Sequence, residues 1–463
     1  MVAIPLLSGI QGSRGAEFTT AYPINLEPVP VKSGLSEGQF RMTAGAIPCA
    51  TGPGADRGGT LWNGVVYRVM GSSLVRVDTN LSVSVIGSVG GTGPVRFDYS
   101  FSHLGIHSGT ALYLFDGTSL SQVNDVDLGV VKDALWVDGY WMTTDGTHMV
   151  VTELSNPFEV KPLKYGSAED DPDMIVGLVK TRGEVHAIGR HSIQPQRNVG
   201  GSGFPFATVR NATIPYGCVS ATAKTEFGDT YAFVGSKRNE ALSVLLGGQS
   251  DATKISTREV DDALAAEPDK EAIVLESRQY RNERRLYVHL STETWVFLSA
   301  ATARAGEPMW HRAQSAAGQP YRIRNAVEWN GRHLVGDRDT STLAWLADDV
   351  SSHFGDPAQW EFQTGFVYNG GSGGLLKSVE LVGLPGRVPA EEEATAFMSM
   401  TRDGVTWSIE RAISMGRAGE RTKRLEWRPR TRFANYIGLR FRGYNRAMPG
   451  FARLEADIEA LGA

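Results

Sequence analysis

The sequence is poor in cysteine and has no long apolar run. Cys49 and Cys218 are the only cysteines among 463 residues, and neither has metal-ligand spacing around it. We therefore expect two buried free thiols rather than a disulfide framework or a zinc site. No stretch approaches the ~18 consecutive apolar residues of a membrane helix, and no positive charge precedes the apolar start MVAIPLL. These absences predict a soluble protein made in a cytoplasm.

The common catalytic and metal-binding motifs are also missing. The chain contains no His-Glu-x-x-His, Gly-x-Ser-x-Gly, P-loop or Cys-x-x-Cys pattern. His103 and His107 lie four residues apart, but Gly105 between them indicates strand and turn. GGSGG (370–374) is typical of a turn, and EDDPD (169–173) lacks the spacing of a calcium loop. The sequence thus predicts no catalytic residue, no metal and no cofactor, and we expect a protein that is not an enzyme.

Glycine and aromatic residues, by contrast, are abundant. Glycine accounts for 53 residues, alongside 10 Trp, 14 Tyr and 18 Phe, which suits many short strands joined by tight turns. Asn-Gly or Asp-Gly follows an apolar or aromatic residue in LWNG (61–64), LFDG (114–117), WVDG (136–139) and EWNG (328–331). Because both central residues of a type I′ turn need positive φ, each of these stretches predicts the tip of a hairpin.

The segment 134–154 shows how such turns combine. Asp138-Gly139 and Asp145-Gly146 flank YWMTT, which is long enough for one short strand, so the segment predicts a three-stranded antiparallel meander. Similar units of about 40 residues follow one another between about 58 and 350. Their spacing predicts an all-β fold with a β-propeller of about six or seven irregular blades, because a ring buries each sheet against its neighbours. An array of β-sandwiches is the alternative.

The ends of the chain differ from this middle. Residues 1–57 are rich in Pro and Gly and predict an extended N-terminal arm, whereas 58–352 are assigned to the propeller. Residues 353–463 predict a C-terminal domain like a β-sandwich, against which the arm can pack as a platform. The tail ARLEADIEAL (452–461) fits a helix or a strand, and its alternation favours the strand.

One helix is predicted within the propeller. Ser256 and Glu259 have capping-box spacing at the start of an acidic first turn, and Pro268 follows the last apolar position. We therefore expect a short helix over 257–266, inserted between two blades.

The modest net charge of −5 conceals two opposite regions. Residues 116–173 contain 12 acidic and 3 basic residues, whereas 411–446 contain 11 basic and 2 acidic residues. The basic run is interleaved with aromatic residues, so it can contact DNA phosphates or an acidic protein face, or it can form a solvated surface. The candidate interface or DNA-facing residues are Arg421, Lys423, Arg424, Arg428, Arg430, Arg432, Arg440 and Arg442.

Several stretches carry a resemblance to a known family. The most specific are TTDGTHMVVTEL (143–154) and AKTEFGDTYAFVG (223–235). Further matches are YPINLEP (22–28), VVYRVMGSSLVRV (65–77), Trp310, the pair Gly336-Asp337 and the turn 401–404. On these residues the chain resembles the packaged-DNA stabilisation proteins, which are the tail hub or nozzle of short-tailed phages (podoviruses).

This resemblance implies a structural component of the virion tail without enzymatic activity. In that family, copies form a ring, a homohexamer, below the portal and its adaptor. The ring continues the DNA channel, helps to retain packaged DNA until ejection, and supports distal tail parts. The implied partners are further copies of the chain, the head-to-tail adaptor protein, tail needle, fibre or tailspike proteins, and packaged double-stranded DNA. Because a head-to-tail ring pairs different patches of identical subunits, we expect 411–446 to meet 116–173 of a neighbour, or the adaptor.

A carbohydrate-binding or glycan-cleaving propeller of a phage fibre or cell-surface protein is the alternative function. TRDGVTW (401–407) resembles the Asp-box turn of sialidase propellers, but Asp403 and Gly404 are adjacent, so one residue is missing. Asp-boxes are in any case structural turns remote from the catalytic centre. Exposed tryptophans and paired carboxylates in a central pocket would favour this alternative.

Overall fold

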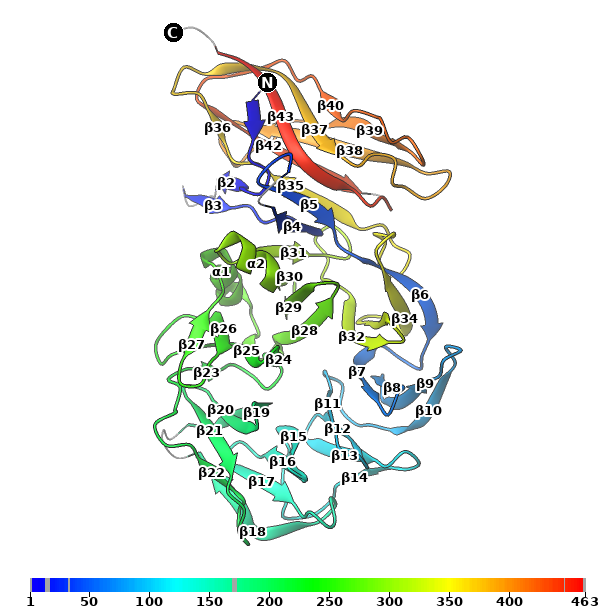
Figure 1. The fold of residues 1–463 in the computed structure, drawn as a ribbon, viewed down its shortest axis with the longest axis vertical. Helices are drawn as coiled ribbons and strands as arrows, with labels where there is room; N and C mark the ends of the chain where they lie inside the picture. The colour runs from blue at the N-terminus through cyan, green and yellow to red at the C-terminus, as the bar shows by residue number, and fades with distance from the viewer. Residues whose placement is uncertain (1, 13–16, 32–33, 169–172, 445, 461–463) are drawn as a thin grey trace.

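The computed structural model describes residues 2–12, 17–31, 34–168, 173–444 and 446–460, which form two β-rich parts (Figure 1). Strands hold 53% of the residues and helices 4%, which confirms the predicted all-β class. A ring of seven sheets occupies most of the elongated molecule, and a two-sheet sandwich lies at one end. No helix in the described ranges is long and apolar enough to cross a membrane.

The first four sheets of the ring are four-stranded antiparallel blades. Blade 1 contains β7 (Asp56–Trp62), β8 (Val65–Met70), β9 (Ser73–Val77) and β10 (Val83–Ser88). Blade 2 contains β11 (Arg96–Tyr99), β12 (Leu104–Ser108), β13 (Ala111–Phe115) and β14 (Leu120–Gln122). Blade 3 contains β15 (Asp133–Val137), β16 (Tyr140–Thr144), β17 (His148–Thr152) and β18 (Val160–Ser167). Blade 4 contains β19 (Ile175–Thr181), β20 (Glu184–Gly189), β21 (Ile193–Asn198) and β22 (Phe206–Thr208).

The last three blades depart from this regular pattern. Blade 5 contains β23 (Gly217–Cys218), β24 (Lys224–Phe227), β25 (Thr230–Ser236), β26 (Ser243–Gly247) and β27 (Ala252–Lys254). Blade 6 contains β28 (Val274–Tyr280), β29 (Glu283–His289), β30 (Thr294–Leu298) and β31 (Trp310–Ala313), with α2 (Ser299–Ala305) before its last strand. Blade 7 contains β32 (Ile323–Trp329), β33 (Arg332–Asp337) and β34 (Thr342–Ala347), and β6 (Gly45–Thr51) supplies its outer strand.

The ring closes through contacts between its ends. The inner strands β7, β11, β15, β19, β24, β28 and β32 adjoin in this order, and β32 returns to β7. Arg68 binds Asp56 through Nε and Nη2, both at 2.8 Å, and Asn325 Nδ2 donates to Asp56 Oδ2 at 2.7 Å. A Cβ on Gly336 would lie 2.2 Å from Asp56 Cγ, so glycine permits the close approach of blade 7 to blade 1. Since Asp56 and Arg68 are fully buried, this polar contact stabilises the closed ring.

Three of the predicted hairpin tips are two-residue turns with positive φ at both positions. These are Asn63-Gly64, Asp138-Gly139 and Asn330-Gly331, and the meander over 134–154 is confirmed as β15, β16 and β17. The tips at Asp116 and Asp145 have longer loops, because each carboxylate accepts backbone N–H groups two and three residues on. Both positions are hairpin tips as predicted, between β13 and β14 and between β16 and β17, whereas the two-residue turn predicted at Asp145-Gly146 is wrong.

The predicted helix is confirmed as α1 (Arg258–Ala266), which lies between β27 and β28 together with the short 3₁₀ helix η1 (Lys270–Ala272). The predicted capping box is wrong. Thr257 is the N-cap residue and its side chain makes no capping bond. Ser256 instead donates to Asp261 Oδ1 at 2.5 Å, and the Glu259 carboxylate accepts the Thr20 N–H at 3.0 Å.

The sandwich is built from both ends of the chain. Its first sheet, the β4–β40 sheet, has the order β4 (Leu26–Pro30), β5 (Gly38–Met42), β43 (Gly450–Ala460), β37 (Gly374–Gly383) and β40 (Glu426–Trp427), with β1 (Val2–Ile4) on β43 and β41 (Thr431–Phe433) on β37. Its second sheet, the β35–β39 sheet, has the order β35 (Gln359–Gln363), β42 (Tyr436–Tyr444), β38 (Glu393–Thr401) and β39 (Arg411–Arg417), with β36 (Val367–Tyr368) on β42. A hairpin of β2 (Ile10–Gly12) and β3 (Phe18–Thr20) lies beside it. The predicted terminal strand is thus confirmed as β43.

Aromatic side chains fill the space between the two sheets. The rings of Trp360 and Phe451 are 4.9 Å apart, and those of Phe362 and Phe441 stack at 5.1 Å. All four side chains are fully buried or nearly so. Because buried aromatic residues contribute large apolar areas, this cluster is the main source of cohesion of the sandwich.

Buried polar groups join the sandwich to the propeller. Glu27 on β4 accepts from Arg285 on β29 at 2.6 and 2.9 Å, and Arg41 on β5 donates to the same carboxylate at 2.5 Å. Asn25 donates to the Gln314 and Gln359 carbonyls, both at 2.7 Å, so one side chain ties the end of blade 6 to the start of the C-terminal sheet. Burial acts to raise the pKa of Glu27, but the Arg285 charge outweighs burial and lowers the pKa to about 2. The carboxylate therefore stays ionised inside the junction.

Candidate functional site

The central channel of the propeller is lined by several charged side chains. The inner strands surround a cavity of about 540 Å³ along the ring axis. Its lining includes Arg96, Asp98, Lys180, Lys224, Glu226 and Glu276. The lining carries charges of both signs, which permits ion pairs between blades that are not neighbours in sequence.

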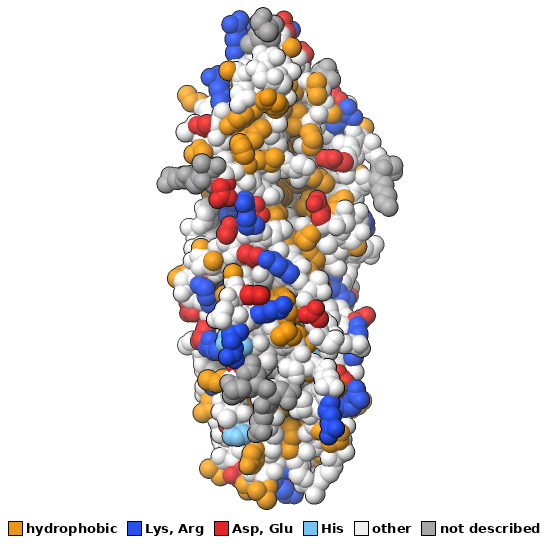
Figure 2. Space-filling model, turned by 90° about the vertical axis from the view of Figure 1, so that its left-hand side faces the viewer, with side chains coloured by type: hydrophobic (Ala, Val, Ile, Leu, Met, Phe, Trp, Pro, Cys, Tyr) orange, Lys and Arg blue, Asp and Glu red, His pale blue; other side chains and the backbone are white. Residues whose placement is uncertain are grey.

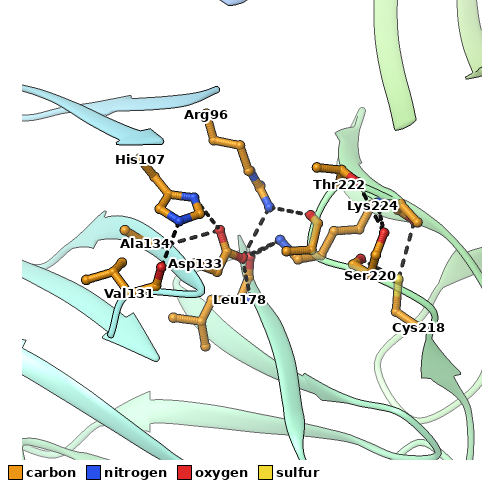
Figure 3. Close-up of polar contacts among 12 residues, drawn as sticks. Arg96, His107, Val131, Asp133, Ala134, Leu178, Cys218, Ser220, Thr222 and Lys224 are labelled. Carbon is orange, nitrogen blue, oxygen red and sulfur yellow. Dashed lines mark hydrogen bonds and ion pairs between the residues drawn. The ribbon is translucent and has the colours of Figure 1, made fainter. Parts of the chain in front are cut away.

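Asp133 is the centre of the largest of these networks (Figure 3). Its Oδ2 atom accepts from Lys224 Nζ at 2.5 Å, from the Leu178 N–H at 2.7 Å and from Arg96 Nη1 at 3.2 Å. Arg96 also donates to the Ala221 carbonyl at 3.0 Å. These residues come from blades 2, 3, 4 and 5, so one carboxylate connects four neighbouring segments of the ring.

The protonation states in this network follow from burial and neighbouring charge. Burial acts to raise the pKa of Asp133, but the Arg96 and Lys224 charges outweigh it and lower the pKa to about 2. Burial and the nearby Arg96 lower the pKa of Lys224 to about 8. Lys224 is completely buried and bonded to Asp133 and the Leu178 carbonyl, so it is held as an ion-pair partner rather than presented as a nucleophile.

Two further contacts cross or line the channel. Lys180 on blade 4 donates to both oxygens of Asp98 on blade 2 at 2.7 and 2.8 Å, and Asp98 also accepts the Trp136 N–H of blade 3 at 2.7 Å. Glu276 on blade 6 accepts the Asn325 and Ala326 N–H groups of blade 7 at 3.0 and 2.9 Å. The channel is therefore bridged by side chains, and these contacts hold the blades in a fixed arrangement.

Sequence reasoning missed these channel residues, although a signal was present. Each unit begins with a strand in which charged residues interrupt an apolar run, as in Arg96 and Asp98, Lys180, and Lys224 and Glu226. In a propeller, the first strand of each blade faces the axis. A charge repeated in the first strand of successive units thus indicates a polar channel once the ring is recognised.

The eight basic candidate residues do not form one surface. Arg440 and Arg442 lie on β42 of the β35–β39 sheet, where they alternate with buried Leu439 and Phe441. The other six lie on or beside β40 and β41 of the β4–β40 sheet. The run of basic residues in the sequence is therefore divided between the two sheets of the sandwich.

Most of these basic side chains have acidic partners within the sandwich. Arg424 binds both oxygens of Glu380 at 2.6 and 2.8 Å, Arg428 pairs with Glu426, and Arg442 pairs with Glu410. Arg440 Nη2 lies 3.9 Å from Glu410, and Lys423 Nζ lies 3.8 Å from Glu420. Arg421, Arg430 and Arg432 make no ion pair with any residue that the structure describes.

Most of the described acidic residues of the region 116–173 lie in turns and loops between strands. Asp116 and Asp145 accept backbone N–H groups of their own loops, and Asp125 accepts the Val160 N–H at 3.0 Å. Asp133 is buried in the channel. Residues 169–172 of the EDDPD segment lie outside the described residues, and Asp173 accepts the His191 and Ser192 N–H groups. Much of the local charge therefore has a structural role.

The two histidines of the FSHLGIHSG stretch and the two cysteines have ordinary structural environments. His103 Nδ1 contacts the Ser102 hydroxyl, whereas His107 Nε2 contacts the Val131 carbonyl, so the two rings do not converge. Within the described ranges, no group of three His, Cys, Asp or Glu side chains could hold a metal ion. Cys218 is buried as predicted, whereas Cys49 is only half-buried, and both thiols are free. Burial raises the pKa of each thiol to about 11, so neither is a reactive thiolate at neutral pH.

A propeller with a bridged polar channel, locked to an aromatic-cored sandwich, defines a rigid structural β-protein. A family model described as Bacteriophage P22 Gp10, beta-propeller, matches residues 2–351, and one described as Bacteriophage P22 Gp10, beta-sandwich, matches residues 359–459. The chain belongs to this family. It is 24% identical over 464 aligned positions to the tail hub protein gp10 of Salmonella phage P22, covering 95% of each chain. The chain is a phage tail hub protein, a component of the virion tail.

Solved structures resemble the chain only loosely. The N-terminal domain of Nup159 is 9% identical with a TM-score of 0.39, and the match covers 71% of this chain and 99% of that domain. The Pan2 WD40 domain of Neurospora crassa is 10% identical with a TM-score of 0.39, covering 63% of this chain and 89% of that domain. At these TM-scores the similarities carry no argument about function.

Proposed function

We propose that copies of this tail hub form a closed sixfold ring below the portal and the head-to-tail adaptor, and that the ring lumen continues the path of the packaged DNA. The observation that supports this proposal is the network across the propeller channel. Single side chains reach from blade 2 to blades 4 and 5, as in Lys180–Asp98 and Arg96–Ala221. A duplex therefore has no path through one subunit, and a DNA conduit requires a lumen between copies.

The rigid junction supports the retention of DNA by such a ring. Packaged DNA exerts an outward force on the proteins that close its exit. A subunit with a flexible hinge would bend under this force. Asn25 and Glu27 lock the sandwich onto blade 6 through buried hydrogen bonds and ion pairs. Removing one partner of such a buried pair costs about 3–5 kcal/mol, which favours a single rigid subunit.

The elongated shape gives separate surfaces for different tail proteins. The sandwich occupies one end of the molecule, and blades 3 and 4 lie near the other (Figure 1). We propose that these ends separately contact the adaptor and the distal needle, fibre or tailspike proteins. The basic residues of the sandwich without acidic partners, Arg421, Arg430 and Arg432, are the part of the predicted basic set most available to a neighbour or to DNA.

We also propose that the chain has no catalytic activity. All ten tryptophans lie within the described ranges, and eight are buried while Trp136 and Trp407 are half-buried. An exposed aromatic platform of the kind that binds sugar rings is therefore not formed by tryptophan in this protein. Asp98, Asp133 and Glu276 in the channel are already bound by cations or backbone N–H groups, which disfavours a carboxylate pair acting on a glycan.

Electron microscopy of the purified chain, alone and with its head-to-tail adaptor, tests the ring. We expect sixfold rings with an open axial lumen on the adaptor, with the sandwich and the propeller at different heights. Particles assembled without this chain should lose packaged DNA to external nuclease. Density for the chain away from the tail axis, or glycan hydrolysis by the purified chain, would contradict the proposal.

A further inference from the structure

An apolar groove lies where the sandwich meets the propeller. It has a volume of about 1020 Å³, and its lining comes from the N-terminal segment, β4, and the loop between α2 and β31. Figure 2 faces this side of the molecule and shows apolar side chains gathered over the sandwich and in the hollow beneath it. The apolar lining includes Leu7, Ile10, Val29, Val31, Met309 and Trp310.

The edge of β4 gives this groove an unusual backbone chemistry. Pro28 and Pro30 have no N–H group, so β4 must bond β5 through Glu27 and Val29, which pair with Arg41 and Gln39. The Pro28 and Pro30 carbonyls then lie on the side of β4 away from β5, and both prolines line the groove. This edge offers acceptors without donors, so it cannot extend the sheet with a full strand, but it can accept side-chain N–H groups.

The rim of the groove carries unpaired negative charge. Its charged lining residues are Glu37, Glu259, Glu307 and Arg304. Glu37 and Glu307 are exposed, and neither forms an ion pair with a described residue, whereas Glu259 is bonded to the Thr20 N–H. An acceptor-only edge and two free carboxylates above an apolar floor select a cationic partner with long apolar stems, which describes arginine better than any other residue.

The opposite edge of the same sheet carries such arginines. The sheet order places β4 at one edge and β40 at the other, with β41 continuing beside β40 along β37. The turn between β40 and β41 has the sequence Arg-Pro-Arg-Thr-Arg (428–432), and Arg428, Arg430 and Arg432 are exposed. Arg430 and Arg432 have no acidic partner among the described residues, so one sheet has complementary charges at its two edges.

We propose that the 428–432 turn of one copy docks into the β4 groove of the next copy, with Arg430 and Arg432 facing Glu37 and Glu307. This inference rests on the proposed ring and identifies its subunit contact. Opposite edges of one sheet form a heterologous interface, which closes into a ring when the rotation between copies is suitable. Both edges belong to one sheet of the sandwich, with β4 on the side next to the propeller and β40 on the side away from it (Figure 1). The acidic region 116–173 lies toward the far end of the molecule, away from both edges (Figure 1).

Charge reversal at each edge separately tests the contact. The groove variant carries E37R and E307R, and the edge variant carries R430E and R432E. We expect each variant alone to assemble at least about 100-fold more weakly than the natural chain, because like charges face each other across the contact. A matched control, E240R and E328R, changes the same charge at exposed propeller positions and should assemble normally.

Two combinations show whether the two edges meet each other. A chain with all four reversals has an Arg groove and a Glu edge, so it should regain rings. An equimolar mixture of the groove variant and the edge variant should also assemble, because every contact again joins opposite charges. Assembly is followed by mass photometry and electron microscopy on the adaptor, and thermal melting of each variant verifies its fold.

The outcomes separate this inference from the proposed function. Normal rings from both double variants, or no recovery in the four-fold variant, would overturn the contact and leave the ring in place. Recovery only when another tail protein carries the reversed charge would assign the groove to that protein and overturn the contact between copies. Failure of the natural chain to form any ring on the adaptor would overturn the proposed function itself.

Discussion

The propeller and the sandwich of this tail hub place their charged groups differently. In the propeller, the ion pairs Asp133–Lys224, between blades 3 and 5, and Asp56–Arg68, within blade 1, are fully buried. In the sandwich, the pairs Arg424–Glu380 and Arg428–Glu426 lie on the outer face, and the space between the sheets is aromatic. In a seven-bladed ring, the inner edge of every blade faces the central axis, and apolar contacts alone cannot bury it there. Two facing sheets, by contrast, can bury their inner faces in apolar contacts. The two parts should therefore respond differently to pH and to loss of charge.

Acidification should produce the largest difference. Burial lowers the pKa of His186 and His311 to about 4 and that of His289 to about 3, and all three lie in the propeller. The unfolded chain binds protons at histidine below about pH 6.5, whereas these folded histidines do not until about pH 4, so stability falls as the pH drops. No histidine follows His353 in the sequence, so the sandwich lacks this effect.

Between pH 7 and pH 5 we expect the propeller to lose about 3–6 kcal/mol in total. Calorimetry with tryptophan fluorescence at both pH values would measure the loss. Replacing all three histidines by glutamine should remove most of the pH dependence. Equal destabilisation of both parts on acidification would contradict the assignment.

Removal of the central carboxylate should have the next largest effect. Asp133→Ala leaves Lys224 buried without its ion-pair partner and removes an acceptor from Arg96. We expect a loss of about 3–5 kcal/mol in the free energy of unfolding of the propeller. Denaturant titration measures it, and the Lys224→Met/Asp133→Leu double variant, which removes both charges, should recover much of the loss. A loss below about 1 kcal/mol would show that the network is dispensable.

Weakening the junction should have a smaller effect on stability and a clear effect on cooperativity. Glu27→Gln keeps hydrogen-bonding capacity but leaves the buried Arg285 without its counter-charge. We expect a loss of about 1–3 kcal/mol and a separation of the propeller and sandwich melting transitions in calorimetry. The exposed substitution Glu328→Gln, outside the junction, serves as the control and should leave the melting profile unchanged.

Loss of an outer pair in the sandwich should have the smallest effect. Arg428 and Glu426 are paired on the solvent side, with 71% of the Arg428 side chain exposed. Arg428→Ala should leave the unfolding free energy nearly unchanged, because solvent screens exposed pairs. Urea titration of this variant beside Asp133→Ala compares the sandwich and the propeller directly. Similar losses of unfolding free energy in the two variants would contradict the difference between their charge pairs.

Local sequence predicted some turns of the structure correctly and failed at others. Asn63-Gly64 and Asp138-Gly139 form the expected turns because positive φ at both positions is a property of the dipeptide itself. Asp145 does not, because its carboxylate binds the N–H groups of Thr147 and His148 and stabilises a longer loop. The capping box was wrong for a similar reason, since Ser256 has a better partner in Asp261.

The predicted basic surface shows that a run of basic residues in the sequence does not by itself indicate one basic surface. Arg440 and Arg442 alternate with buried residues on β42, whereas Arg430 and Arg432 lie at the edge of the other sheet. Arginines only about ten positions apart in the sequence thus lie in different surroundings. Acidic partners such as Glu380 and Glu410 lie far enough away in the sequence that no local pattern indicates them.

The sequence by itself determined the all-β class, the repeated hairpins and the short helix, because turn chemistry and residue periodicity act over a few residues. Only the tertiary structure decided that the blades number seven, that β6 completes the last blade, and that Asp133 joins four blades. It also decided that one sheet has acceptors and carboxylates at one edge and free arginines at the other. These features depend on contacts between segments up to about 400 residues apart, whose closeness follows from the closure of the ring and the pairing of both chain ends in one sandwich.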